Sequence, residues 1–325
     1  MKAIVFNQYG PPDVLTLADV PVPIPRADQV LVKVVAVSVN SADARLLSGL
    51  APRMLGYGLI RPHNKIMGAD IAGVVEAVGQ NVTRFKAGDE VFGDLSGAGF
   101  GGFAEFACAP ESILVTKPAS VTFEQAAAVP MAAVTALQGL RKAGTKPTDH
   151  VAVVGASGGV GTFAVQLAKA LGAEVTAIAS TKNLPLLRTL GADHIIDYTR
   201  EDFTQNGQRY DLILAVNGYR RLSEYRRALK PQGTYLMIGG KGRQLTEALV
   251  LGPLLSRRGG QTMTHVQAQP SADDLSLITA LLEAGKVTPV IAGTYPLAAT
   301  AEAVAYVSAG HAAGKVVIRT GQHPA

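Results

Sequence analysis

One glycine-rich segment limits the possible folds of this chain more than any other. Residues 151–180 read VAVVGASGGVGTFAVQLAKALGAEVTAIAS, and residues 151–168 carry no charged side chain. An uncharged stretch of this length could span a membrane. However, four glycines fall between positions 155 and 161, which favours a loop over a spanning helix. The segment therefore predicts a buried strand, a tight turn, a helix and a second strand.

The turn has the spacing of a dinucleotide-binding fingerprint. Ala156, Gly158 and Gly161 occupy the three positions of the G-x-G-x-x-G pattern, with alanine in place of the first glycine. Gly158 would let the backbone approach a pyrophosphate, and Gly161 would let the helix pack closely against the strand. The alternative is a tight strand–helix turn that holds no ligand. We predict cofactor binding by the whole turn, namely Ala156, Ser157, Gly158, Gly159, Val160 and Gly161.

The end of the second strand bears on which dinucleotide would bind. NAD enzymes carry an acidic residue about 20 positions beyond the turn, whereas here the strand ends in Ser180, Thr181 and Lys182. Hydroxyls and an ammonium would bind a 2′-phosphate that a carboxylate would repel. We therefore predict NADPH as the cofactor. In the alternative interpretation, Ser180 and Thr181 only start the next helix and Lys182 is solvated.

Two later strands end in residues that suit the same ligand. Asn217 ends a predicted strand in DLILAVNG, and Gly239 and Gly240 end the next one in LMIGG. In parallel sheets flanked by helices, ligands bind beyond the carboxyl ends of the strands. We therefore predict cofactor contacts at these three positions, although each residue could instead serve only a turn.

The chain divides into regions of different pattern. Residues 1–122 contain short β-branched runs separated by proline and glycine, which predicts an antiparallel barrel. Residues 123–265 alternate strand and helix patterns, which predicts an α/β domain with a doubly wound parallel sheet. Residues 266–325 carry two helical patterns and the strand GKVVIRT, and their composition does not decide which domain they join.

Composition argues against several partners. The net charge of +5 is modest for 325 residues, and the arginine clusters lack the interleaved aromatic residues of a base-stacking surface. We therefore expect no nucleic-acid partner. The single cysteine, Cys108, cannot form an intrachain disulfide. The N-terminus lacks an apolar signal-peptide region, so we expect a cytoplasmic protein without a membrane partner.

Several stretches together resemble one family over nearly the whole chain. They include MKAIVFNQYGPPDVLTL, GADIAGVVEAVG, FKAGDEVFG, the glycine-rich segment and LGADHIIDY. This set resembles the zinc-independent quinone oxidoreductase branch of the medium-chain dehydrogenase/reductase superfamily, to which zeta-crystallin belongs. The resemblance implies a GroES-like catalytic domain whose N-terminal part is residues 1–122, followed by a Rossmann NADP-binding domain at 123–265. Residues 266–325 would then return to the catalytic domain. The resemblance also implies a homodimer joined through the edge strand of the Rossmann sheet, here GQTMTHV.

The zinc ligands of related alcohol dehydrogenases are missing. Asn40 stands where those enzymes carry a first catalytic cysteine, and Gly68-Ala69-Asp70 replaces their Gly-His-Glu. The segment near Met131 has no second cysteine, and the histidines show no HxxxH or HxH spacing. None of the nitrogen and sulfur ligands that zinc prefers is therefore present at these positions, and we predict no metal.

The resemblance also implies which residues line the substrate cleft. Asn40 matches a position near the nicotinamide ribose and is the candidate catalytic residue, and Asp43 completes the Asn-x-x-Asp pattern of the family. Many relatives carry a tyrosine two residues after this aspartate. The chain has Arg45 there, which weakens the case for a tyrosine-assisted proton step, while Tyr57 could reach the cleft from a loop. On the cofactor side, the matching residues are Thr135 near the nicotinamide and Tyr198 near the 2′-phosphate.

The missing zinc narrows the chemistry. Without a Lewis acid, hydride delivery from NADPH suits quinones and α,β-unsaturated carbonyl compounds, because their developing oxyanion is delocalised. We therefore predict an NADPH-dependent oxidoreductase acting on such an electrophilic small molecule. Two alternatives remain open: a zinc-free alcohol or aldehyde reductase, and an NADPH-binding protein with a structural, regulatory or RNA-binding role.

Overall fold

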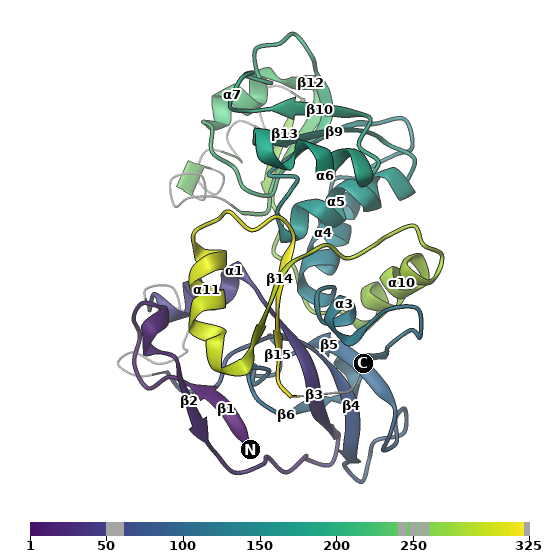
Figure 1. Cartoon of the computed structure of the whole chain (residues 1–325). Helices are drawn as coiled ribbons and strands as arrows, with labels where there is room; N and C mark the ends of the chain where they lie inside the picture. The colour runs from purple at the N-terminus through teal and green to yellow at the C-terminus, as the bar shows by residue number, and fades with distance from the viewer. Residues whose placement is uncertain (50–61, 240–245, 248–251, 253–255, 257–259, 322–325) are drawn as a thin grey trace. The chain divides into compact units, whose positions relative to one another are not determined.

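A computed structural model describes residues 1–49, 62–239, 246–247, 252, 256 and 260–321 of the chain (Figure 1). The chain forms two compact units. The first comprises Met1–Met131, Pro270–Gly285 and Pro289–Ala325, and the second comprises Ala132–Gln269 and Lys286–Thr288. The units thus divide after residues 131 and 269, whereas the sequence placed its boundaries after 122 and 265.

The first unit is built on a mixed sheet with strands from both ends of the chain. β15 pairs antiparallel with β3, and β14 pairs parallel with β15, so the last strands join the sheet formed by the first hundred residues (Figure 1). The strands in sheet order are β14 (Ile291–Pro296), β15 (Lys315–Arg319), β3 (Gln29–Val39), β4 (Asp70–Val78), β5 (Glu90–Asp94) and β7 (Leu114–Thr116), with β6 (Phe106–Pro110) paired to β3. A separate hairpin-like pair consists of β1 (Lys2–Val5) and β2 (Thr16–Asp19).

β3 is the central strand of the first unit. It pairs with β4, β6 and β15 along its two edges, and residues 30–39 are buried apart from Lys33. Because successive residues on both faces are buried, its sequence is mostly apolar rather than alternating. The helices of this unit are α1 (Ser41–Leu47), α3 (Phe123–Ala127), α10 (Ala272–Glu283) and α11 (Thr300–Ser308). α3 is capped by Thr122, whose Oγ1 accepts a hydrogen bond from Gln125 N at 3.2 Å.

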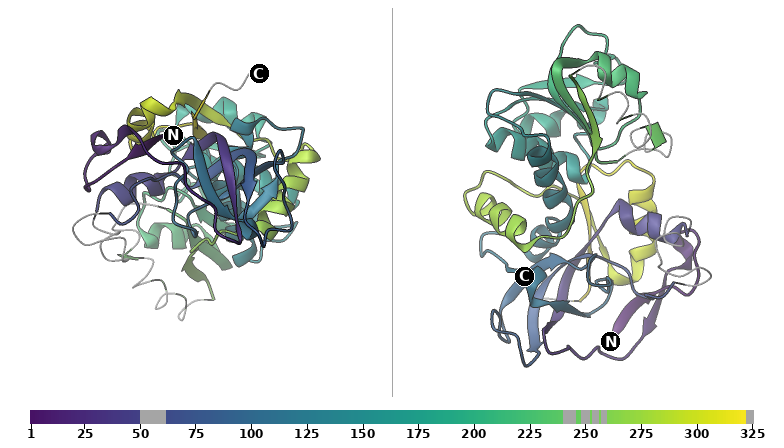
Figure 2. Two further views of the ribbon diagram at one scale, coloured as in Figure 1. Left: turned by 90° about the horizontal axis from the view of Figure 1, so that it is seen from below. Right: turned by 180° about the vertical axis from the view of Figure 1, so that it is seen from behind.

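The second unit contains a parallel sheet, as predicted. Figure 2 shows its strands side by side from behind. Their order is β10 (His194–Asp197), β9 (Glu174–Ala179), β8 (His150–Val154), β11 (Tyr210–Ala215), β12 (Leu229–Met237) and β13 (Thr262–His265). The chain runs outward from β8 in one direction through β9 and β10, and then resumes on the other side of β8 with β11. A sheet of this order binds ligands at the carboxyl ends of the strands, where the direction reverses.

Helices cover both faces of this sheet. A side chain added at Gly139 of α4 (Pro130–Lys142) would touch Leu214 and Leu236, whereas Tyr225 of α7 (Leu222–Arg227) packs in one cluster with Ile213 and Tyr235. Neighbouring strand residues point to opposite faces, so α4 and α7 lie on opposite sides. The other helices of this unit are α5 (Gly159–Ala170) and α6 (Leu184–Thr189). Among the residues described, no helix has the length and hydrophobicity needed to cross a membrane.

Candidate functional site

The glycine-rich turn joins β8 to α5 at the carboxyl edge of the parallel sheet. Gly155 adopts φ +81°, a left-handed conformation that glycine tolerates best, and a Cβ there would lie 2.9 Å from Asn217 Cβ. The backbone N–H groups of Gly155 and Ala156 both donate to the carbonyl of Ile178, each at 3.1 Å. The turn is therefore fixed between the ends of β9 and β11.

The two later glycines of the fingerprint have different surroundings. A Cβ on Gly161 would lie 2.2 Å from the carbonyl oxygen of Gly155, so this glycine is required for the helix to pack against the turn. A Cβ on Gly158 would meet only the same oxygen, at an ordinary contact distance of 3.5 Å. Protein packing therefore does not demand glycine at 158, and the predicted close approach of a pyrophosphate would account for it. Gly158 also leaves the N-terminus of α5 without a capping side chain, which suits a phosphate.

The structure brings several predicted residues to the same edge. Asn217 N donates to the carbonyl of Val154 at 3.2 Å, and Gly218 N donates to the carbonyl of Gly239 at 3.1 Å. The ends of β8, β11 and β12 are thereby tied together beside the turn. Gly240 lies outside the described residues.

Asn183 is a member of this edge that the sequence analysis missed. Its Nδ2 donates to Ser157 Oγ at 2.9 Å and lies 3.5 Å from Ser180 Oγ, so it links the turn to the end of β9. The signal in the sequence was only its position directly after Lys182. Its amide orients both predicted hydroxyls, which makes it a positioning residue for the cofactor edge.

A carboxylate also reaches the end of β9, contrary to the sequence argument. Asp197, the last residue of β10, accepts a hydrogen bond from Thr181 Oγ1 at 2.5 Å. This bond and those from Thr199 lower the pKa of Asp197, so it stays ionised near neutral pH. The sequence argument considered β9 alone and therefore overlooked this charge. Lys182 is exposed, and Arg200 Nε lies 3.7 Å from Asp197 Oδ2, so cations are also present at this edge.

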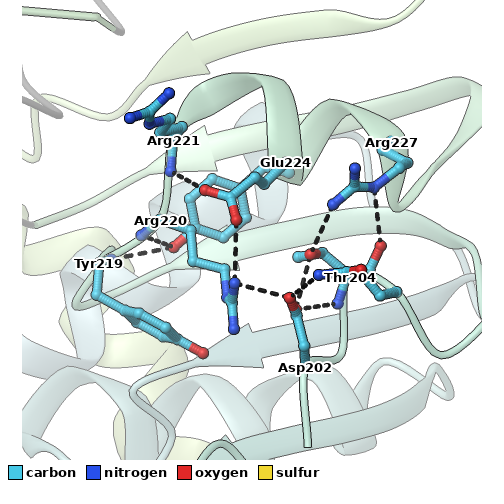
Figure 3. Close-up of polar contacts among 9 residues, drawn as sticks. Asp202, Thr204, Tyr219, Arg220, Arg221, Glu224 and Arg227 are labelled. Atoms are coloured by element: carbon cyan, nitrogen blue, oxygen red, sulfur yellow. Dashed lines mark hydrogen bonds and ion pairs between the residues drawn. The ribbon is translucent and has the colours of Figure 1, made fainter.

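The loop after β11 is held by a partly buried arginine, Arg220 (Figure 3). Arg220 Nη1 lies 2.8 Å from Asp202 Oδ2 and 3.0 Å from Glu224 Oε1. Its guanidinium also lies 5.3 Å from the ring centre of Tyr219, within the range of a cation–π contact. The Tyr219 ring in turn lies 5.4 Å from the ring of Tyr198, the residue expected near the 2′-phosphate. The arginine thus fixes a partly exposed aromatic pair beside the cofactor edge.

The first unit contains a buried polar cluster around Asn40. Asn40 Nδ2 donates to Asp70 Oδ2 at 3.0 Å, and Asn40 Oδ1 accepts from Lys315 Nζ at 2.6 Å. Lys315 Nζ also lies 3.2 Å from Asp70 Oδ2. Asp70 also accepts hydrogen bonds from Ser38 Oγ at its Oδ2 and from Met131 N at its Oδ1, both at 2.9 Å. Every polar group of this cluster is therefore satisfied, which a buried ion pair requires.

Two further carboxyl groups adjoin this cluster. Asp43 Oδ2 accepts from Asn40 N at 2.7 Å, which closes the first turn of α1. Burial raises the pKa of Asp43 to about 7, against the opposing effect of that hydrogen bond. Burial and the nearby charge of Asp70 raise the pKa of Asp94 to about 6. The raised pKa of Asp43 limits the negative charge that surrounds the single ammonium of Lys315 near neutral pH.

The remaining predicted positions are placed as follows. Arg45 is exposed in the last turn of α1, and Thr135 is buried within α4 in the second unit. Tyr57 lies outside the described residues. Lys315 was not among the residues predicted from the sequence. Its position at the start of the apolar strand KVVIR was a usable signal, because a lysine buried with that strand needs an anionic partner.

The positions that carry zinc ligands in related alcohol dehydrogenases do not fit that metal here. The side chains of Asn40 and Asp70 offer only oxygen and amide groups, and both already bind the ammonium of Lys315. Zinc sites in proteins are built mainly from thiolates and imidazoles. The ammonium of Lys315 is thus the cation at this place, and it occupies the acceptor atoms Asn40 Oδ1 and Asp70 Oδ2 that a metal would need.

Two family models match the chain. Residues 26–119 match the alcohol dehydrogenase GroES-like domain, and residues 190–318 match the zinc-binding dehydrogenase family. The positions compared above with zinc ligands, at Asn40, Gly68-Ala69-Asp70 and Met131, lie outside residues 190–318.

Curated proteins and solved structures resemble the chain over its full length. It is 34% identical to a chloroplast envelope quinone oxidoreductase homolog of Arabidopsis thaliana, covering 98% of each chain. It is 35% identical to an NADPH-dependent alkenal/one oxidoreductase of the same plant, covering 98% of this chain and 79% of that protein. The structure of a quinone oxidoreductase from Coxiella burnetii superposes with a TM-score of 0.88 at 31% identity, covering 99% of each chain.

Proposed function

The chain belongs to the quinone oxidoreductase branch of the medium-chain dehydrogenase/reductase superfamily, and we propose that it reduces quinones or α,β-unsaturated carbonyl compounds with NADPH. The single observation that carries this proposal is the cluster of Asn40, Asp70 and Lys315, which replaces a metal site by hydrogen-bonded side chains. The names of the similar proteins support the same substrate class.

The bound cofactor would supply the hydride, and the protein would supply its position. The turn at Gly158 and the uncapped N-terminus of α5 support the binding of a pyrophosphate here, because a Cβ on Gly158 would meet protein only at an ordinary contact distance of 3.5 Å. In the first unit, the ammonium of Lys315 fixes the amide of Asn40 through its oxygen. An acceptor with a delocalised oxyanion needs only hydrogen-bond donors and no Lewis acid.

An acceptor screen tests this function. NADPH and NADH oxidation are followed side by side with 9,10-phenanthrenequinone, a 2-alkenal and a saturated aldehyde, and the metal content of the same sample is measured. We expect turnover with the first two acceptors in a preparation free of zinc. Preference for the saturated aldehyde would favour an alcohol or aldehyde reductase, and tight NADPH binding without turnover on any acceptor would contradict an enzymatic role.

We further propose that NADPH is preferred over NADH. Ser180, Lys182 and Tyr198 support this preference because hydroxyls and a cation suit a 2′-phosphate. Asp197 opposes it, since its carboxylate could instead accept a hydrogen bond from a ribose 2′-hydroxyl. The preference therefore rests on the balance of charges between Lys182 and Asp197.

Substitution of Lys182 tests this balance. We expect Lys182→Ala to raise KM for NADPH about tenfold, equivalent to about 1.4 kcal/mol, while KM for NADH changes less than twofold. Asp197→Asn should lower KM for NADPH by removing a repelling charge. Lys146→Ala, at an exposed lysine elsewhere in the second unit, serves as the control. Equal effects of Lys182→Ala on both cofactors would refute the assigned role of this lysine.

We also propose a homodimer that pairs through β13. This strand ends the six-stranded sheet, and an edge strand presents free backbone groups for pairing. Light scattering coupled to size-exclusion chromatography should give twice the chain mass. A Thr262→Pro variant should shift the protein toward monomer, and a monomeric wild-type protein would contradict the proposal.

A further inference from the structure

Three potential metal ligands meet at the amino edge of the parallel sheet. His150, Glu174 and His194 are the first residues of β8, β9 and β10. In the sheet register, His150 lies opposite Glu174, and His194 lies opposite Thr176. Glu174 and Thr176 are two residues apart on one strand, so all these side chains share one face. One ligand atom from each of the three residues lies within 4.8 Å of the other two.

The three side chains differ in how firmly they are held. His150 is half-buried, its Nε2 lies 2.8 Å from Thr176 Oγ1, and its ring packs on Tyr210 at 4.7 Å between centres. His194 Nε2 lies 2.7 Å from Glu174 Oε1, and these two side chains are 47% and 53% exposed. Thr176 and Tyr210 thus hold His150 in place, whereas the exposed side chains of Glu174 and His194 can move toward a bound ion.

We propose that His150, Glu174 and His194 form a binding site for a first-row transition-metal ion, with Zn²⁺ as the reference ligand. Two imidazoles and one carboxylate are an established donor set for such ions, with metal–ligand distances of about 2.0–2.2 Å. Tetrahedral geometry at those distances separates ligand atoms by about 3.3 Å. The Glu174–His194 pair would therefore open by about 0.6 Å as the metal replaces the shared proton. Water would take the fourth position.

The neighbouring charges are compatible with a bound cation. Lys230, close to His150, is paired with Asp211 at 2.7 Å, which offsets its charge. Asp193 precedes His194, but its carboxylate is held by Lys169 Nζ at 2.8 Å and by Val175 N at 2.7 Å. The site therefore rests on the three named residues.

The site would be independent of the proposed hydride transfer. The glycine-rich turn follows the carboxyl end of β8, and a strand of five residues spans roughly 16 Å. A metal that ties the amino ends of three strands should stabilise the second unit without touching the cofactor edge. Zinc binding and NADPH turnover can therefore succeed or fail separately.

Titration of the untagged full-length chain tests the site. The protein is freed of metal with a chelator, which is then removed, and ZnCl₂ or MgCl₂ is added in a calorimeter at pH 7.5. We expect one Zn²⁺ per chain and no Mg²⁺ binding, because Mg²⁺ prefers oxygen ligands. His194→Gln and Glu174→Gln should each weaken Zn²⁺ binding at least tenfold. His311→Gln, at an exposed histidine of the first unit, should bind as the wild type does.

Thermal unfolding gives a second readout. Zn²⁺ should raise the melting temperature of the wild type and of His311→Gln, and should leave that of the two ligand variants unchanged. Both ligand variants alter exposed side chains and should melt like the wild type in chelator, which shows that they fold. Absence of Zn²⁺ binding by the wild type, or undiminished binding by either ligand variant, would overturn the proposal.

Discussion

Replacing Lys315 by methionine should test the buried cluster of the first unit. Lys315 is 3% exposed and Asp70 is fully buried, and the ammonium lies 2.6 Å from Asn40 Oδ1 and 3.2 Å from Asp70 Oδ2. Methionine has a similar length but no charge, so the variant would leave the Asp70 carboxylate buried beside Asp43 and Asp94 without its cation. Breaking a buried pair in this way costs about 3–5 kcal/mol.

The magnitude can be measured as a melting temperature. For units of 150–250 residues, 1 kcal/mol corresponds to about 2–4 °C, so Lys315→Met should lower the melting temperature of the first unit by about 6–20 °C. Differential scanning calorimetry at pH 7.5 gives this value. Hydrogen exchange followed by mass spectrometry should show the loss of protection in peptides that contain β3, β4 and β15.

Two further variants make the result specific. Asp70→Asn combined with Lys315→Met removes both charges and should recover part of the lost stability, because no unpaired charge remains buried. Lys2→Met breaks a shorter ion pair, 2.6 Å from Lys2 Nζ to Asp19 Oδ2, but one that is exposed. It should leave the melting temperature unchanged. A melting temperature of Lys315→Met within about 2 °C of the wild type would refute the reasoning.

Two other predictions concern the Asp43 carboxyl and the glycine turn. Folding raises the pKa of Asp43 from 3.8 to about 7. The stabilisation of the folded state by the protonated Asp43 carboxyl is therefore complete below pH 4. The free energy of unfolding then falls by about 4 kcal/mol as the pH rises through 7 and this carboxyl loses its proton. Asp43→Asn should flatten the pH dependence of the melting temperature between pH 4 and 8, and an unchanged profile would argue against this pKa. Gly158→Ala should weaken NADPH binding at least tenfold while changing stability by less than about 1 kcal/mol. Gly161→Ala should destabilise the second unit by about 1–3 kcal/mol, because its Cβ would lie 2.2 Å from the carbonyl oxygen of Gly155. Fluorescence titration with NADPH and thermal unfolding separate the two glycines.

Local patterns in the sequence predicted the elements that depend on neighbouring residues. The strand, turn and helix of residues 151–170 follow from apolar runs and glycine spacing. The alternation of strands and helices predicted the parallel sheet, which the structure confirms. These features need no knowledge of distant contacts, since backbone geometry and short-range hydrogen bonds decide them.

The cofactor edge was predicted less completely from the sequence than the strand–turn–helix, because one of its charged residues comes from a neighbouring strand. Ser180, Thr181 and Lys182 were placed correctly after β9, but Asp197, which reaches Thr181 from β10, was missed. The two strands are adjacent in the sheet, and their register sets which residues meet at its edge. That register depends on packing of the entire sheet, so a scan along one strand could not reveal the carboxylate.

The sequence by itself thus determined the two kinds of unit, the glycine-rich strand–turn–helix with the spacing of a dinucleotide fingerprint, and which residues stand at the family's zinc-ligand positions. Only the tertiary structure decided that Lys315 lies against Asn40 and Asp70, which are 275 and 245 positions away. It likewise decided that His150, Glu174 and His194 share one face of a sheet edge. The physical reason is that strand order and register are set by the burial of apolar residues far apart in the sequence. The register then decides which side chains of neighbouring strands come into contact.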